Sequence, residues 1–564
     1  PLAVLLPAAV AAALALSRGV AAAAAHPHRA EQDAAAGRGE SESPARLPRP
    51  PRPPRPAVPV SRPTSLSALL DDSSRESLVA AEGSSPRRRA PHAPALTAAD
   101  SDGKLSAAAF TAPVAAAAPA AAPVAASARD ELTRVHRSPL SEKELVCDDE
   151  ELGVSTVYEA LLSAVNRFGR RPCLGVRRPL SVERLGARFG DYVWATYDDL
   201  YRRVLSVGSA LVRLGLARGE PIGLLCDNCP EWVVAEQACH AYGLVSVPLW
   251  FTLGVSYALK LLQDSAVVCV VCGERWTGAL LTMVHEGKLP ALRIIVQREH
   301  LRYEELVLKE TLEQARAGGG PLPVRLYDFG FVERMGECQR LPPAPPAASA
   351  LATIVYRWRL DADPVGCRLS QANLVASMCA LRLCTRPLLG EHDVHLSYVP
   401  LAHIFERSIL LLCLSSGAGV GFYHGRQTAL LEDVRALRPT FLVGLPGAFR
   451  QMVRKYTAVR QQWSRPYRLF FEWAWQRKKR AAEAGHPSQP LLDRFLFGGI
   501  TASLGGRLRF LLVCDRNFDT QVRDFFQVAL SARVLIGFGF PEAGGLVTIQ
   551  PADSAAAAAA DSQL

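Results

Sequence analysis

The residues best suited to hold phosphate lie between positions 351 and 407. An apolar run, LATIVY, precedes a turn-rich segment that contains Asp363, Pro364 and Gly366. The next segment, SQANLVASMCALRL, has apolar residues at helical spacing, which predicts a helix that begins at Ser370. A strand, a loop and a helix N-terminus commonly bind phosphate, because unpaired backbone N–H groups point toward the anion. The stretch therefore predicts a phosphate-binding loop between a strand and a helix.

This stretch resembles the long-chain fatty acid–CoA ligases of the AMP-forming acyl-adenylate synthetase superfamily. Its closing segment, YVPLAHIFER at residues 398–407, matches the family's Y-x-P-L-A-H-x-F-E-R in full. In the preceding loop Asp363, Pro364 and Gly366 match, and the resemblance assigns them to nucleotide binding. The six residues before them are RWRLDA, and Val365 stands at the lysine position. The loop keeps the family's length but lacks the glycines, hydroxyls and lysine that bind triphosphate.

A second group of candidate residues lies in the segment GFGFPE, residues 537–542, which resembles the family's G-Y-G-x-T-E. The resemblance assigns Gly537, Phe538 and Gly539 to nucleotide binding, with the Phe538 ring against adenine. It assigns Glu542 to catalysis, as a carboxylate that binds Mg²⁺. Upstream, VCDRNF at residues 513–518 replaces the family's adenine loop S-G-G-A-P-L at constant length.

The resemblance implies a two-step reaction. A fatty carboxylate attacks the α-phosphate of ATP, which yields acyl-AMP and pyrophosphate, and the thiol of coenzyme A then displaces AMP. ATP, Mg²⁺ and coenzyme A are the implied cofactors, and a long-chain fatty acid is the implied substrate. His403 and Glu406 are assigned to the acyl and CoA side. A structural role for a buried histidine in an apolar helix is an equal alternative.

The altered nucleotide loops leave the catalytic competence of this chain open. The favoured hypothesis is an AMP-forming long-chain fatty acid–CoA ligase. The alternative is a non-catalytic protein that binds a fatty acid or acyl-CoA in the same scaffold. Nucleotide binding separates the two hypotheses, because only the first requires it.

Charge and cysteine content bear on partners and compartment. The net charge is +10, and much of the arginine lies before residue 140, in runs such as RLPRPPRPPRP. Such runs can bind nucleic acid, but we favour a solvated tail. The 13 cysteines lie mostly in apolar runs, which favours buried thiols in a reducing compartment. Zinc at the C-x-x-C pairs Cys226/Cys229 and Cys269/Cys272 is the less favoured alternative, because a strand turns the second pair to opposite faces.

The order of elements predicts an α/β fold. Strands and helices alternate after a helix capped by Thr156 and Glu159, which favours parallel, helix-flanked sheets. The segment DNCPEWVVAEQACHAYGLVSVPLWFTLG, residues 227–254, also resembles the N-terminal half of the ligases. We therefore expect the large N-terminal domain of an adenylate-forming ligase, with one α/β half at residues 150–340 and a second at 350–550.

The two ends of the chain are expected to differ from this domain. Residues 1–140 are rich in Ala, Pro, Arg and Ser, which predicts a disordered tail. Residues 1–16 within it suit either a signal or anchor segment or a low-complexity alanine tract. Residues 551–564 are predicted to be a low-complexity end, with the family's small C-terminal domain absent.

One segment bears on the membrane. RPYRLFFEWAWQRKKR, residues 465–480, mixes aromatic residues with Arg and Lys. It suits either a membrane interface or a helix packed on the domain with a solvated basic face, and the two interpretations are even. We expect a protein associated with the endoplasmic reticulum or another intracellular membrane, on its cytosolic side.

Overall fold

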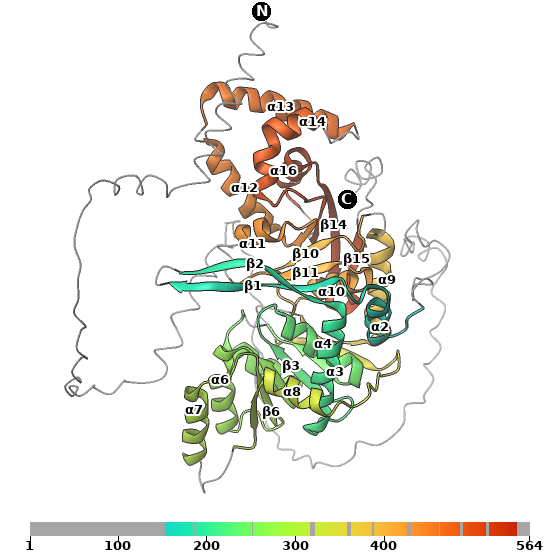
Figure 1. Ribbon diagram of the computed structural model, residues 1–564, viewed down its shortest axis with the longest axis vertical. Helices are drawn as coiled ribbons and strands as arrows, with labels where there is room; N and C mark the ends of the chain where they lie inside the picture. The colour runs from blue at the N-terminus through green and yellow to red at the C-terminus, as the bar shows by residue number, and fades with distance from the viewer. Residues whose placement is uncertain are drawn as a thin grey trace, which may run out of the picture. The chain divides into compact units, whose positions relative to one another are not determined.

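The computed structural model describes most of the predicted domain. It covers residues 153–549 except for these short gaps: 184–185, 251, 316–321, 358–362, 386–387, 426–429, 462, 485–488 and 515–517. The predicted tail at 1–140 and the end at 551–564 therefore lie outside the described residues. Two sheets organise the described part of the chain (Figure 1).

The first sheet has seven strands in the order β7-β6-β5-β3-β4-β8-β9. All pairings are parallel except the hairpin of β8 and β9 at one edge. The strands are β3 (Pro221–Leu225), β4 (Val245–Pro248), β5 (Cys269–Cys272), β6 (Ile294–Gln297), β7 (Arg325–Asp328), β8 (Leu351–Arg357) and β9 (Val365–Ser370).

The second sheet has eight strands in the order β15-β14-β13-β12-β10-β11-β1-β2. Its central pairings are parallel, and an antiparallel strand closes each edge. The strands are β1 (Pro172–Glu183), β2 (Gly186–Thr196), β10 (Val394–Ser397), β11 (Gly419–Phe422), β12 (Phe441–Gly444), β13 (Phe510–Cys514), β14 (Arg533–Phe540) and β15 (Gly545–Ile549).

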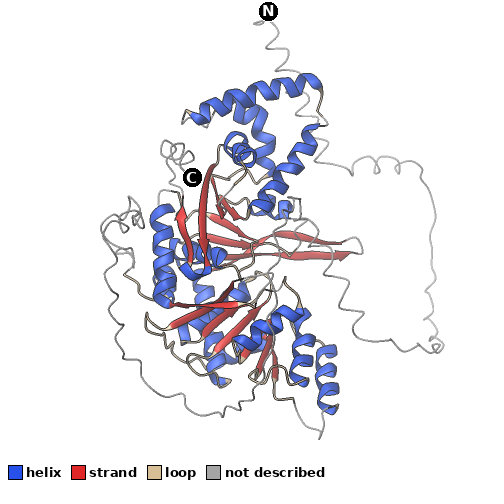
Figure 2. Cartoon of the chain, turned by 180° about the vertical axis from the view of Figure 1, so that it is seen from behind, coloured by secondary structure: helices blue, strands red, loops and turns tan. Residues whose placement is uncertain are grey.

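Helices cover both sheets, as the view from behind shows (Figure 2). They are α2 (Val157–Phe168), α3 (Tyr197–Arg213), α4 (Pro230–Tyr242), α5 (Val255–Asp264), α6 (Glu274–His285), α7 (Tyr303–Gln314), α8 (Phe329–Cys338), α9 (Gln371–Thr385), α10 (Ile404–Ser416), α11 (Leu430–Leu437), α12 (Pro446–Gln461), α13 (Arg465–Glu483), α14 (Pro490–Leu492), the π-helix η5 (Asp493–Phe497), α15 (Gly498–Ser503), α16 (Thr520–Leu530) and the 3₁₀ turn η6 (Pro541–Ala543).

Burial on both faces explains why the strands read as continuous apolar runs. In β5, Cys269 and Val271 pack in the hydrophobic cluster that includes α3 and α4, whereas Val270 and Cys272 pack in the cluster that includes α5 and α6. The first of these clusters also contains Val420 of β11 and residues of α10, so one helical layer serves both sheets. The thiols of Cys269 and Cys272 accordingly lie on opposite faces of β5.

The sequence prediction of two helix-flanked α/β sheets is confirmed. The capping box of Thr156 and Glu159 forms at the start of α2, and Thr196 forms another with Asp199 at the start of α3. Helix α4 spans the predicted residues 230–242. The expectation of parallel strands holds for the sheet centres and for the β7 edge, and is wrong at the other three edges, where the strands pair as antiparallel hairpins.

Each sheet takes a hairpin from the other half of the sequence. Strands β1 and β2, from residues 172–196, join the second sheet beside β11, and β8 and β9, from residues 351–370, join the first beside β4. The β8–β9 hairpin also corrects the predicted order of a strand, a phosphate-binding loop and a helix in this stretch. Gly366 lies in strand β9 opposite Tyr356, so a second strand, and not a loop, leads into α9.

Helix α13 has one buried face and one exposed face. Phe471 is buried and Trp475 packs beside it in the core, whereas Leu469 and Trp473 are 74% and 55% exposed. One face of α13 therefore packs on the domain, as the packed-helix interpretation expects, whereas Leu469 and Trp473 lie on the exposed face. Among the described helices, none is both long enough and apolar enough to cross a bilayer.

Candidate active site

Glu542 lies at the carboxyl edge of the second sheet, in the turn η6 that follows β14. This turn packs against β8 and β9 of the first sheet. The next residue but one, Gly544, adopts φ +73°, and its carbonyl accepts hydrogen bonds from Ser377 Oγ of α9 (3.0 Å) and Ser408 Oγ of α10 (3.2 Å). Four elements, namely β8, β9, α9 and α10, therefore position the Glu542 turn.

The Glu542 carboxylate pairs with a guanidinium. Arg357 Nη1, at the end of β8, donates to Glu542 Oε1 over 3.1 Å. The Cys367 thiol of β9 also lies close. Burial is the main cause that raises the pKa of this thiol, and the nearby Glu542 carboxylate raises it further. The thiol is therefore in its neutral form, which is a poor metal ligand.

In nucleotide sites Mg²⁺ is usually bound by one or two carboxylates together with waters and substrate phosphates, and the Glu542 carboxylate here already contacts a guanidinium. The described residues contain no group of three or more His, Cys, Asp or Glu side chains placed to hold a metal. The residues around Glu542 thus do not fit a divalent ion in the described arrangement, and we derive no chemical step through one.

The residues that match the phosphate loop lie at the same edge, on the β8–β9 hairpin. Asp363 is exposed and pairs with Lys260 of α5, with 3.2 Å between Oδ1 and Nζ. A Cβ at Gly366 would lie 3.0 Å from Ile354 Cγ2, so packing within the hairpin accounts for this glycine. Pro364 precedes β9, and residues 358–362 lie outside the described residues. Whether this hairpin contacts nucleotide stays a prediction.

The GFGFPE residues form the end of β14. A Cβ at Gly539 would lie 2.0 Å from the Gly545 carbonyl oxygen, so the pairing with β15 excludes any larger residue. The Phe538 ring is 47% exposed and meets Phe540 edge-on, with centroids 6.0 Å apart. An exposed ring on a rigid strand is available for stacking, and its contact with adenine stays a prediction.

His403 and Glu406 lie one turn apart and face different partners. His403 caps α10, where its Nδ1 accepts from the Phe405 N–H (3.2 Å), and its ring meets Trp250 edge-on. Burial lowers the pKa of His403, with a smaller opposite effect from Glu406, so the ring is neutral near pH 7. Glu406 is buried, and its Oε1 lies 3.0 Å from His395 Nε2 of β10. The role assigned to both residues stays a prediction.

Sequence reasoning missed the polar residues that hold the YVPLAHIFER segment in place. Asn228, after β3, donates to Ser397 Oγ (2.9 Å) and to the Val399 carbonyl (2.7 Å), and accepts from the Leu401 N–H (2.9 Å). Three hydrogen bonds from one buried amide thus join the carboxyl ends of β3 and β10.

A buried ion pair joins the helices that follow β3 and β10. Glu236 of α4 pairs with Arg407 of α10, and both side chains are 2% exposed. Arg407 Nη2 also lies 3.5 Å from Ser246 Oγ of β4. The signal for Glu236 was present, because it is a charge inside a largely apolar helix.

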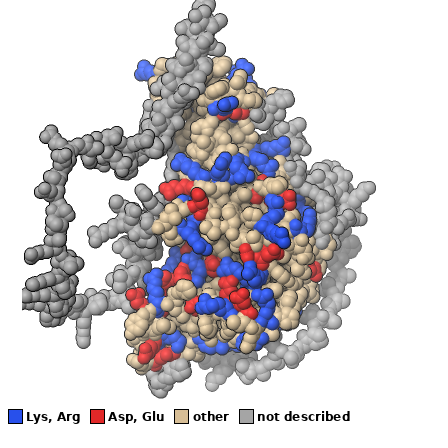
Figure 3. All heavy atoms as spheres, in the orientation of Figure 1, with Lys and Arg blue, Asp and Glu red and all other residues tan. Residues whose placement is uncertain are grey.

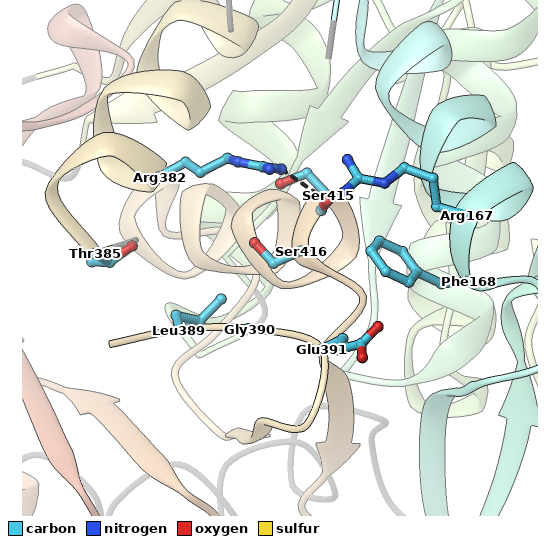
Figure 4. Close-up of a pocket in the computed structure, with 9 residues that line it drawn as sticks. All are labelled: Arg167, Phe168, Arg382, Thr385, Leu389, Gly390, Glu391, Ser415 and Ser416. Atoms are coloured by element: carbon cyan, nitrogen blue, oxygen red, sulfur yellow. Dashed lines mark hydrogen bonds between the residues drawn. The ribbon is translucent and has the colours of Figure 1, made fainter. Parts of the chain in front are cut away.

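A separate cavity lies at the opposite ends of the strands. It has a volume of about 220 Å³ and is lined by residues at the C-terminal ends of α2, α9 and α10, including Phe168 and Thr385. In Figure 4 the side chains of Arg167 and Arg382 reach from two helices toward Ser415, whose carbonyl accepts from Arg382 (3.1 Å). None of the residues predicted from the motifs lines this cavity. The candidate site is therefore the carboxyl edge, where ligands bind in open α/β sheets.

The fold is that of the adenylation domains. The adenylation domain of a carboxylic acid reductase from Segniliparus rugosus, solved with AMP and a co-purified carboxylic acid, matches with a TM-score of 0.55. The sequences are 18% identical, and the match covers 72% of this chain and 62% of that chain. At this identity the match establishes the fold alone.

The model of the family described as AMP-binding enzyme matches residues 163–562, and the chain belongs to this family. It is 30% identical over 416 residues to long chain acyl-CoA synthetase 6, peroxisomal, of Arabidopsis thaliana, a match that covers 73% of this chain and 56% of the relative. It is 29% identical over 396 residues to long-chain-fatty-acid–CoA ligase 1 of Cavia porcellus, covering 69% and 54%. The resemblance to long-chain ligases is thus confirmed, and the chain spans about half the length of these relatives.

Proposed function

We propose that the protein is an AMP-forming ligase that activates a long-chain fatty acid to acyl-AMP and then to acyl-CoA. One observation carries this proposal. Ser408, directly after the intact YVPLAHIFER segment, donates to the Gly544 carbonyl beside Glu542. Two segments that match the ligases therefore meet at one sheet edge, as a site that joins an acyl group to a nucleotide requires.

The described residues suggest a role for each part of this edge. The exposed Phe538 ring would stack on adenine. The Arg357 guanidinium would stabilise negative charge on phosphoryl oxygens. A neutral His403, near Trp250, would border the acyl or CoA side. ATP, coenzyme A and a long-chain fatty acid are the proposed ligands, and Mg²⁺ remains the metal that the family implies.

Formation of acyl-AMP and acyl-CoA by the purified chain tests this function. With palmitate, ATP·Mg²⁺ and coenzyme A, mass spectrometry should detect palmitoyl-AMP and then palmitoyl-CoA. Glu542→Gln should lower acyl-AMP several tens-fold or more, because Glu542 holds the Arg357 guanidinium, and a positioned positive charge at a developing oxyanion contributes on the order of 3 kcal/mol. Lys260→Ala, at the same edge, is the matched control. If neither product forms, the ligase proposal fails.

The second candidate is a non-catalytic protein that binds a fatty acid or acyl-CoA. The contact between Arg357 and Glu542 favours it, because this contact occupies the carboxylate that the ligases are expected to use. A rise in melting temperature with palmitate but not with ATP would support this candidate, and a rise with ATP would support the ligase.

We also propose that the protein acts at a membrane surface, on the cytosolic side of the endoplasmic reticulum or another intracellular membrane. The outward face of α13 supports this, because Leu469 and Trp473 lie among the exposed residues Arg465, Arg477 and Arg480. On the face drawn in Figure 3, basic and acidic side chains are interspersed, unlike the single-sign field that favours nucleic acid.

Sedimentation with liposomes tests the membrane proposal. Trp473→Ala should reduce binding to liposomes that contain anionic lipid. Tyr303→Ala, which removes a comparably exposed aromatic side chain from α7, should not. Equal binding by both variants and the wild type would contradict a role for α13.

A further inference from the structure

The contact between Arg357 and Glu542 is built by tertiary structure. The two residues are 185 positions apart, at the end of β8 and in η6. The Glu542 turn is anchored by Ser377 and Ser408 through the Gly544 carbonyl, and Arg357 ends a strand that pairs with both β4 and β9. The guanidinium and the carboxylate are therefore held opposite each other by rigid elements.

Both carboxylates at this edge that match the family's motifs have a cation from the chain itself. Glu542 contacts Arg357 at 3.1 Å, and Asp363 contacts Lys260 at 3.2 Å. At Glu542, a guanidinium therefore lies where a metal ion would otherwise contact the carboxylate.

We infer that Arg357 takes the place of a divalent cation at this edge, so that the site binds the phosphate groups of a nucleotide without metal. A guanidinium suits this task, because it stays charged and presents a planar fork of donors that matches phosphate oxygens. Arg357 is 57% exposed and its pair with Glu542 lies at the surface, so the side chain reaches a ligand without opening the core. For nucleotides the inference rests on the proposed function, but phosphate binding by Arg357 does not.

Calorimetric titration with two probes, ATP and inorganic pyrophosphate, tests the inference, each in excess EDTA and in excess Mg²⁺. The wild type should bind both probes with the same affinity in EDTA as in Mg²⁺. Arg357→Ala should weaken binding in EDTA roughly tenfold to a hundredfold, the loss typical of a hydrogen bond to a charged group. Part of that loss should return with Mg²⁺, because Glu542 is then free for the ion. Arg357→Lys, which keeps the charge and loses the fork, should fall between the two.

The outcomes separate this inference from the proposed ligase function. ATP binding by the wild type that requires Mg²⁺, or that survives Arg357→Ala in EDTA, overturns the inference and leaves the ligase proposal standing. Pyrophosphate binding without ATP binding, lost in Arg357→Ala, supports the arginine site and contradicts the ligase. If neither probe binds in either condition, both proposals fail. Lys260→Ala is the matched control, since it removes a neighbouring exposed cation whose partner is Asp363 and not Glu542.

Discussion

Two Arg–Glu pairs in this protein differ in their surroundings. Glu236 and Arg407 join α4 to α10 in the interior, where both side chains are 2% exposed. Arg357 and Glu542 join β8 to η6 at the sheet edge, with side-chain exposures of 57% and 40%. Glu236, Arg407 and Glu542 lie in segments that match the ligase family, whereas Arg357 begins the segment RWRLDA that departs from it.

The two pairs differ in whether water or an ion can replace one member of the pair. In the interior, separation would leave a charge without water, so the pair persists and holds the two helices together. At the edge, water or an anion can replace either partner at little cost. The comparison indicates that Arg407, in the intact YVPLAHIFER segment, serves stability, whereas the exposed pair at the edge can exchange a partner with solvent or with a bound ion.

Breaking the buried pair should have the largest effect on stability. Arg407→Met leaves Glu236 buried without its cation, and should lower the free energy of unfolding by about 3–5 kcal/mol. The double variant Glu236→Met with Arg407→Met should recover much of that loss, because no charge is then buried. Urea denaturation measures both. A loss below about 1 kcal/mol for the single variant would remove the contrast between interior and edge.

Asn228→Ala should have the next largest effect. The change removes the acceptor for the Leu401 N–H and the donor to Ser397 and Val399, and should cost about 2–3 kcal/mol of unfolding free energy. Asn228→Asp keeps the acceptor alone and should fall between alanine and wild type. Equal stability of all three proteins would show that this amide does not hold the motif.

His240, on the same helix as Glu236, should make the interior sensitive to acid. Its Nδ1 lies 3.1 Å from Gln371 Nε2, and burial, helped by Arg407, lowers the pKa of His240 to about 3. Because the unfolded chain takes up this proton near pH 6.5 and the folded chain does not, stability is complete above that pH and falls as pH drops toward 3.

The loss attributable to His240 should reach about 2 kcal/mol at pH 5. Comparing urea midpoints of the wild type and His240→Asn from pH 7 to pH 4 isolates it, since other groups titrate in both proteins. Parallel curves would show that His240 is protonated in the folded state.

Changes at the exposed edge should have the smallest effect on stability. Arg357→Ala should alter the free energy of unfolding by less than about 1 kcal/mol, because water and salt screen the pair with Glu542. Urea denaturation of the wild type and Arg357→Ala at low and high salt measures this difference. A cost as large as that of Arg407→Met would mean that the edge pair is structural as well.

Much of the fold was predictable because local patterns agreed with it. Caps at Thr156, periodic apolar residues in α3 and the alternation of β3, α4 and β4 are properties of neighbouring residues. The exchanged hairpins were not predictable, because pairing of β1 with β11 depends on contacts more than 200 positions apart. The same limit applies to the site, where residue types suggested Glu542 but nothing local indicated its partner.

The sequence alone determined the alternation of strands and helices, the family resemblance and the residues that match or depart from its motifs, because these depend on residue identity and short spacing. Only the tertiary structure decided that Gly366 belongs to a strand, that Glu406 faces His395 and that Arg357 faces Glu542. Such partners are set by how distant elements pack, and packing is a property of the whole folded chain.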